Sequence, residues 1–143
     1  MSRRVRRRRA MKVATAVTAL VTLAGCQSNP AVEHAEGLTY LRVHGEMVSP
    51  ASLFEAVVYV GEGDCVYVQL PNEPVPGILA LADGTSVSRE GLSTEGGTLH
   101  AFGETLSVEL PASADGSWET PSLPECSEAS NRYHALSFFE ATG

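Results

Sequence analysis

The sequence predicts an all-β domain, and three observations support this fold class. From Leu38 onward the chain consists of short runs of β-branched, aromatic and aliphatic residues, separated by Gly, Pro, Asp and Ser. Residues 105–110 alternate apolar and polar side chains, which is the period of a half-buried strand. No long stretch shows the period of an amphipathic helix. We therefore expect a small antiparallel β-barrel or sandwich, with an OB-like barrel as the favoured form.

The first predicted hairpin is formed by residues 56–60 and 65–70. Between them lies Gly61-Glu62-Gly63-Asp64, which has the composition of a four-residue hairpin loop. Tyr59 and Tyr67 would then face each other across the two strands, a pairing that stabilises a sheet.

Turn signals separate the other predicted strands. Pro71, Pro74 and Pro76 interrupt regular pairing after the first hairpin. Asp83-Gly84 marks a turn, and Gly103-Glu104 predicts a second hairpin. The remaining predicted strands are residues 38–43, 77–82, 98–102, 105–110 and 133–141, with a Pro- and Ser-rich loop at residues 111–131.

The first 25 residues predict an export signal. Residues 1–12 carry seven basic residues and no acidic one, and a mostly apolar run of about a dozen residues follows. That run is shorter than the roughly 20 residues that a membrane-spanning helix needs. A start at Met11 would leave a complete signal, and Ser2-Arg3-Arg4 is only a weak match to a twin-arginine signal, so start site and export route stay open.

The end of this run resembles the lipobox of bacterial lipoproteins. Leu23-Ala24-Gly25-Cys26 places a branched apolar residue and two small residues before a cysteine. The resemblance implies cleavage after Gly25 and a diacylglyceryl lipid, with the palmitate typical of such anchors, on the thiol of Cys26. It predicts a protein anchored on the extracytoplasmic face of the cell membrane. The alternative is an ordinary secretory signal that happens to contain a cysteine.

Three segments follow from this interpretation. Residues 1–25 are the lipoprotein signal peptide, residues 26–37 the lipidated cysteine with a flexible tether, and residues 38–143 a single β domain. The tether is polar and reaches at most ~36 Å when extended, so the domain would stay close to the bilayer.

The predicted mature chain is strongly acidic. From Cys26 onward three arginines stand against 17 acidic residues, a formal charge of −14 with neutral histidines. Such a surface repels phosphate backbones and anionic headgroups, so we expect no nucleic-acid binding.

Cysteine usage predicts one disulfide. With Cys26 lipidated, Cys65 and Cys126 remain as an even pair in an exported chain. A metal site is the alternative, but neither thiol belongs to a Cys-x-x-Cys pair or has a histidine at ligand spacing.

Residues 55–143 loosely resemble small β-barrel domains of actinobacterial lipoproteins and secreted proteins. The resemblance rests on Cys65 after a Gly- and Asp-containing turn, on an Asp-Gly and Gly-Gly meander, and on Cys126 before the last strand. It implies a fold and no particular activity.

No catalytic or cofactor motif stands out in the predicted domain. His44, His100 and His134 could meet in the fold, and Glu62 with Asp64 could offer carboxylates to Ca²⁺, but neither set has ligand spacing, so we expect no metal. A Gly-x-Ser-x-Gly elbow is missing, and we predict that the protein is not an enzyme and has no cofactor besides the lipid on Cys26.

These features predict a non-catalytic binding module at the cell envelope. The expected partners are the membrane, through the lipid, and an envelope protein. Trp118, in the polar stretch Asp115-Gly116-Ser117-Trp118-Glu119, is the candidate interface anchor, or it folds back on the domain. The alternative function is a carrier of a small ligand or metal ion.

Overall fold

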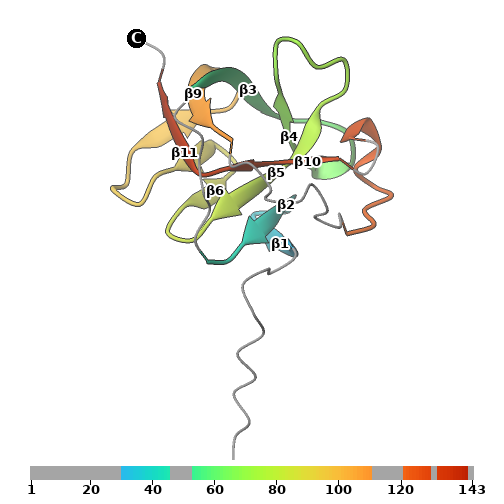
Figure 1. The fold of residues 1–143 in the computed structure, drawn as a ribbon. Coiled ribbons are helices and arrows are strands. Elements are labelled where there is room, and N and C mark those ends of the chain that lie inside the picture. Colours follow the sequence, from blue (N-terminus) through green and yellow to red (C-terminus); the bar gives the residue numbers. More distant parts are fainter. Residues whose placement is uncertain (1–29, 46–52, 111–120, 130–131, 142–143) are drawn as a thin grey trace, which may run out of the picture.

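The computed structural model describes residues 30–45, 53–110, 121–129 and 132–141, and these are all-β, as predicted. The described part contains eleven strands and two short 3-10 turns (Figure 1). In chain order they are β1 (Ala31–Ala35), β2 (Leu38–Val43), β3 (Phe54–Val60), η1 (Glu62–Asp64), β4 (Val66–Gln69), β5 (Gly77–Ala82), β6 (Ser86–Ser88), β7 (Gly91–Ser93), β8 (Leu99–Ala101), β9 (Thr105–Glu109), η2 (Ser127–Ala129), β10 (Tyr133–Leu136) and β11 (Phe138–Ala141).

The strands form one large mixed sheet and one small antiparallel sheet. The large sheet has the order β1-β2-β5-β4-β3-β9-β11, and β10 pairs with β5. The small sheet has the order β6-β7-β8. The prediction of a purely antiparallel fold is wrong, because both β2 and β10 run parallel to β5. Over the described ranges no closed barrel is found, so the OB-like form is not confirmed.

Central strands are buried on both faces, and this explains their nearly continuous apolar sequences. Along β5, Leu79 and Leu81 enter one core and Ile78 and Ala80 enter another. The first core lies on the face that also meets Val87 and Leu92 of the small sheet, and its other buried members are Leu38, Tyr40, Ala56, Val58, Val66, Val68, Leu70, Leu106, Val108, Leu136 and Phe139. The second lies on the opposite face, and its other buried members are Leu41, Val43, Cys65, Tyr67, Leu123, Cys126, Ala129 and Ala135.

The predicted hairpin around residues 61–64 is confirmed. β3 and β4 pair antiparallel from Val60↔Val66 to Val57↔Gln69, and η1 joins them. Tyr59 and Tyr67 are opposite each other, as predicted, with their ring centroids 5.6 Å apart.

The second predicted hairpin is wrong. Residues 98–102 and 105–110 do contain β8 and β9, but β8 pairs with β7, whereas β9 pairs with β3 and β11. The chain turns at Gly103, which has φ +87° and donates its backbone N–H to the carbonyl of Val58 in β3. This contact directs the following residues into the large sheet instead of back along β8.

Part of the predicted tether is a strand. Residues 31–35 form β1, which pairs in full register with β2. Glu36 and Gly37 connect them with φ values of 50° and 80°, the positive pair that a two-residue type I′ turn requires. The folded part therefore begins no later than Ala31, and not at Leu38.

Arg42 is a buried cation that ties β2 to the turn after β5. Its Nη1 donates to the carbonyls of Ala82 and Thr85, and its Nε donates to Glu33 Oε2 at 3.1 Å. Tyr40 also donates to Glu33 Oε2, at 2.8 Å. Burial opposes ionisation of Glu33, but the hydrogen bonds from Tyr40 and Arg42 outweigh it and hold its pKa below the usual value.

Candidate functional site

The candidate site lies in a fork where β3 and β4 separate. Their pairing ends at Val57↔Gln69, because the chain then reaches Leu70 and Pro71, and proline has no N–H to donate to a ladder. β3 continues past this point, but there its pairing is with β9, from Val57↔Thr105 to Phe54↔Val108.

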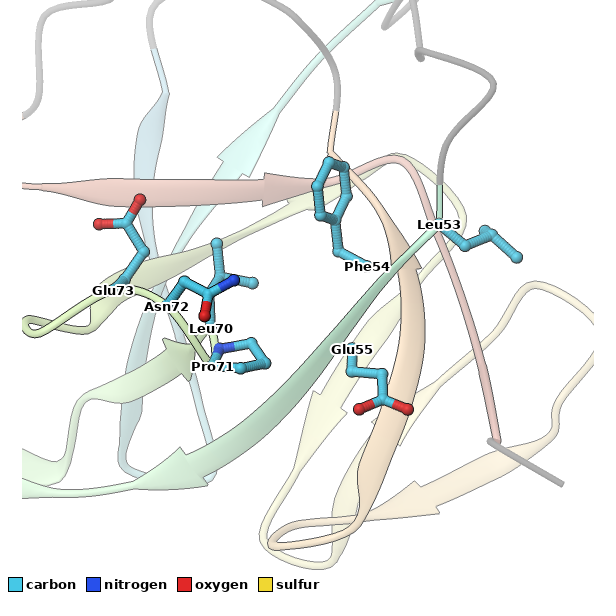
Figure 2. Close-up of a pocket in the computed structure, with 7 residues that line it drawn as sticks. All are labelled: Leu53, Phe54, Glu55, Leu70, Pro71, Asn72 and Glu73. Carbon is cyan, nitrogen blue, oxygen red and sulfur yellow. The ribbon is translucent and has the colours of Figure 1, made fainter.

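A pocket of about 340 Å³ occupies this fork. Figure 2 shows Phe54 on β3 and, across from it, Leu70, Pro71 and Asn72 on the other arm. The remaining lining residues are Leu53, Glu55 and Glu73. The volume is within the range of sites that hold a small ligand or a few side chains of a partner.

Hydrogen bonds hold the Leu70–Glu73 arm in place. The Gln69 side-chain amide donates to the carbonyls of Leu70, at 2.9 Å, and Glu73, at 2.6 Å. The backbone N–H of Glu73 closes the turn onto the Leu70 carbonyl at 3.3 Å. The Glu73 carboxylate also forms an ion pair with Arg132, just before β10. One wall of the pocket is therefore preorganised.

Large apolar side chains are exposed at the mouth of the pocket. Leu53 is 54% exposed and Phe54 43% exposed. Phe54 is on the same face of β3 as Ala56 and Val58, both of which belong to the first core. The core face thus extends to the surface here, and adjacent exposed apolar side chains over a pocket are typical of a binding surface.

Carboxylates lie on the opposite face of the same strands. Glu55 is directly across from Ser107 of β9, and Ser107 is across from Glu140 of β11, so these side chains share one face. Glu109 is two residues beyond Ser107 on that face. The described ion pairs involve Glu33, Glu73 and Asp83, so the structure gives Glu55, Glu109 and Glu140 no described cationic partner.

The histidines do not come together as a site. His44 bonds to Asp83 through Nδ1 at 2.7 Å, and His100 packs edge-on against Phe139. His134 is on β10, with its ring against Gly77. In the part of the chain that the structure describes, no group of three or more His, Cys, Asp or Glu side chains is placed to hold a metal ion.

His134 is expected to make stability fall in mild acid. Burial disfavours the imidazolium and lowers the pKa of His134, and the nearby Glu73 and Arg132 act in opposite directions on it. The unfolded chain therefore binds the proton more readily. The free energy of unfolding should be constant above the usual pKa of about 6.5 and decrease below it, by at most about 1.4 kcal/mol per pH unit.

Chemical denaturation at a series of pH values between 7.5 and 5, about the range in which histidine titrates, checks this prediction. His134→Gln should flatten the dependence in that range. The lowered pKa values of Glu33 and Asp83 affect stability only near and below pH 4.5. An unchanged slope in His134→Gln would assign the effect to other groups.

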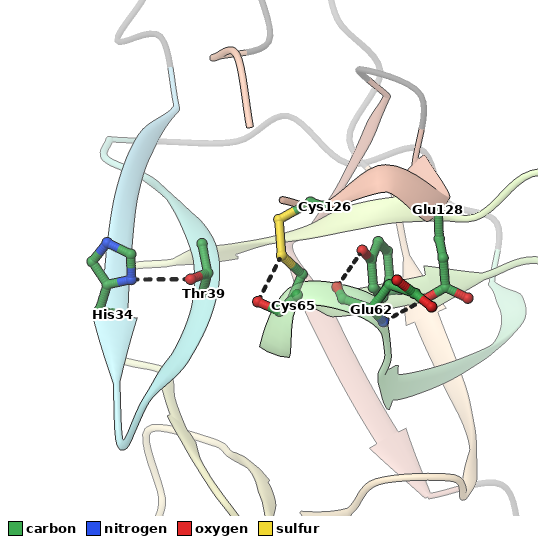
Figure 3. The surroundings of a disulfide bond; sticks show 8 residues. His34, Thr39, Glu62, Cys65, Cys126 and Glu128 are labelled. Atoms are coloured by element: carbon green, nitrogen blue, oxygen red, sulfur yellow. Dashed lines mark hydrogen bonds between the residues drawn. A yellow bond between two sulfur atoms is a disulfide. The ribbon is translucent and has the colours of Figure 1, made fainter. Parts of the chain in front are cut away.

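The predicted disulfide is confirmed. Cys65 and Cys126 are bonded, with their Cα atoms 5.6 Å apart (Figure 3). The Glu62 and Asp64 turn docks the segment that carries Cys126, because the backbone N–H of Glu62 donates to Glu128 Oε2 at 2.9 Å. Gly63 has φ +74° and lies against the Glu125 carbonyl, so a side chain would clash there. These contacts give the Glu62–Asp64 turn a structural role.

The other predicted site residues lie outside the described residues. These are Leu23, Ala24, Gly25 and Cys26 of the lipobox, and Trp118. Their roles stay predictions. No helix in the described ranges is long and apolar enough to span a membrane.

The sequence interpretation missed the fork pocket. The strand was predicted to start at residue 56 instead of Phe54, Leu70 was predicted only as the end of a strand and Pro71 only as a break in pairing, and none of Leu53, Leu70 and Pro71 was predicted to bind a partner. A signal was present: Phe54 continues the alternation of Ala56 and Val58, and Pro71 ends the partner strand.

Fold and site together define a disulfide-containing all-β protein with an apolar surface pocket between diverging strands. No protein family, curated protein or solved structure matches this chain.

Proposed function

We propose that this protein is a lipid-anchored, extracytoplasmic binding module that attaches to an envelope protein through the fork pocket. The observation that supports binding is the exposure of Leu53 and Phe54 over a pocket whose other wall is held by hydrogen bonds. Burying such side chains against a partner is favourable by about 25 cal/mol per Å² of apolar surface. The lipid anchor rests on the Leu23-Ala24-Gly25-Cys26 motif.

The last two strands connect separate parts of the large sheet. β10 pairs with β5 and β11 pairs with β9, and only Ser137 separates these two strands. We propose that this C-terminal stretch bridges the sheet into a small barrel-like form.

A carrier of a small ligand is the second candidate, supported by the pocket volume of about 340 Å³. A carrier should show a rise in melting temperature with a small apolar ligand, and this rise should disappear in Phe54→Ser. A binding module should instead show stable association with one protein.

Proximity cross-linking on intact cells tests the proposal. The wild-type chain should partition into the membrane fraction and capture one recurring envelope protein. Cys26→Ser, which lacks the thiol that takes the lipid, should either keep its signal peptide uncleaved or appear in the medium, and the released form should lose the capture. A Cys26→Ser chain that is cleaved after Gly25 and still partitions into the membrane would contradict the lipid anchor, and an empty capture by the wild-type chain would contradict the binding module.

A further inference from the structure

In the part of the chain that the structure describes, the fork leaves the β4-facing edge of β3 without a partner strand at Glu55. In an antiparallel sheet, successive residues direct their N–H and C=O groups alternately to the two neighbouring strands. Over Phe54–Ala56 one edge pairs with β9, but pairing with β4 on the other edge stops at Val57. The hydrogen bond from Gly61 N–H to the Cys65 carbonyl continues the pairs at Tyr59 and Val57. Glu55 is therefore the next residue whose N–H and C=O face this edge, while Phe54 and Ala56 direct theirs to β9. Among the described residues no further backbone hydrogen bond reaches Glu55. An open strand edge is a template for an added strand.

The side chains on the two faces of β3 determine which residues an added strand would need on each of its own faces. Phe54 is on the core face, where Leu70 and Pro71 complete an apolar pocket. Glu55 is on the opposite face. A strand that pairs with β3 would place its alternate residues on the same two faces. One set would therefore meet the apolar pocket, and the other would meet the Glu55 face.

The charge of the Glu55 face determines which residues of an added strand would lie against it. Glu55 and Glu140 are exposed and Glu109 is half-buried on that face, and the described ion pairs use other carboxylates. Of the three arginines that follow Cys26, Arg42 is buried and Arg132 is paired with Glu73. The surface is thus complementary to Lys or Arg and repels an acidic segment, including one from a second copy of this chain.

We propose that the fork binds an extended segment of a partner protein in which basic and apolar residues alternate. The segment pairs with the free N–H and C=O of Glu55 on β3, its apolar side chains enter the pocket between Phe54 and Leu70, and its basic side chains face the Glu55 carboxylate. This inference rests on the proposed binding function and names the chemistry of the partner.

Matched synthetic peptides test the proposal with the full chain. The probe Lys-Val-Lys-Phe-Lys-Val-Lys alternates the two residue classes. The first control, Glu-Val-Glu-Phe-Glu-Val-Glu, reverses the charge. The second, Lys-Lys-Lys-Lys-Val-Phe-Val, keeps the composition and removes the alternation. The third is the alternating peptide with methyl groups on every second backbone nitrogen, which removes the N–H donors on the edge that would pair with β3. Fluorescence anisotropy gives each affinity. We expect at least about tenfold weaker binding for each control, since one lost anchor or charge set costs on the order of 1.4 kcal/mol.

Two pairs of variants locate the site. Phe54→Ser should weaken binding of the alternating peptide about tenfold, whereas Leu99→Ser, which removes another exposed apolar side chain on β8, should leave it unchanged. Glu55→Lys should weaken it at low salt and less at high salt, whereas Glu90→Lys, an equal charge change between β6 and β7, should have little effect. Thermal unfolding of each variant verifies that it is folded.

The outcomes separate this inference from the proposed function. Equal binding of the alternating and block peptides, or equal effects of Glu55→Lys and Glu90→Lys, would overturn strand addition at the fork. If Phe54→Ser still captures the envelope protein on cells, the inference fails while the binding module stands. Loss of that capture in Phe54→Ser but not in Leu99→Ser supports both.

Discussion

Replacing Cys65 and Cys126 together with alanine is expected to lower the free energy of unfolding by about 4 kcal/mol. The bond closes a loop with a sequence separation of 61 residues. In the chain-entropy model, removing it raises the conformational entropy of the unfolded chain, which stabilises the unfolded state by about 4 kcal/mol. Both cysteines are also buried in the second core, so their loss removes packing around Leu123 and Ala129. Urea denaturation of the full chain measures the difference.

Reduction of the wild-type chain provides the matched control for this variant. A reductant should lower the stability of the wild type to near that of the double variant and leave the double variant unchanged. Hydrogen exchange should show the largest loss of protection at residues 121–129, which the bond attaches to Cys65, just before β4. A stability difference below about 1 kcal/mol would show that the packing of Leu123 and Ala129 holds this segment without the bond.

The second large effect is expected from Arg42→Met. This change keeps most of the side-chain volume but leaves the Ala82 and Thr85 carbonyls without the guanidinium, and it leaves Glu33 without its cation. Because the arginine is buried and the Glu33 carboxylate is one-third exposed, we expect a loss of about 2–3 kcal/mol, below the cost of breaking a fully buried pair. Arg89→Met, at an exposed arginine, should change stability by less than about 0.5 kcal/mol.

The pKa of Glu33 offers an independent measurement for the same variant. In the wild type, hydrogen bonds from Tyr40 and Arg42 outweigh burial and hold the pKa of Glu33 below its usual value. The stability from this group is therefore present above the pKa of the unfolded chain and is lost as pH falls through that of the folded chain. In Arg42→Met the pKa of Glu33 should rise, which NMR titration detects. An unchanged pKa would show that the hydrogen bond from Tyr40, and not Arg42, offsets burial at Glu33.

Local features of the fold were predictable from the sequence, and long-range pairings were not. The Gly61–Asp64 loop and the Tyr59–Tyr67 pair depend on turn chemistry and alternation within a few residues, and both are confirmed. The error at Gly103 arose because a short Gly-containing connection fits either a hairpin or a corner between sheets. Only the hydrogen bond to Val58 distinguishes them, and no local pattern encodes that contact.

The features of the candidate site also divide into those that local sequence predicts and those that long-range pairing determines. The disulfide followed from counting cysteines, because only one pair remained after the lipobox. The alternation at Phe54 and the break at Pro71 indicate where the two strands end, but no local pattern indicates that β3 exchanges its partner from β4 to β9, and this exchange forms the fork. The strand at residues 31–35 was missed despite a signal, since Glu36-Gly37 before an apolar run is a hairpin turn pattern.

The pairing of β10 with β5 has a consequence for how the chain folds. Ile78 pairs with Tyr133 and Ala80 pairs with both Leu41 and Ala135, so the centre of the large sheet joins segments from the beginning, middle and end of the domain. Contacts of such high sequence separation make folding slow, and the contacts with β5 form only once β10 has been synthesised. A chain synthesised from its N-terminus therefore keeps one edge of β5 open until β10 is available, and this exposed edge can pair with other chains in the meantime.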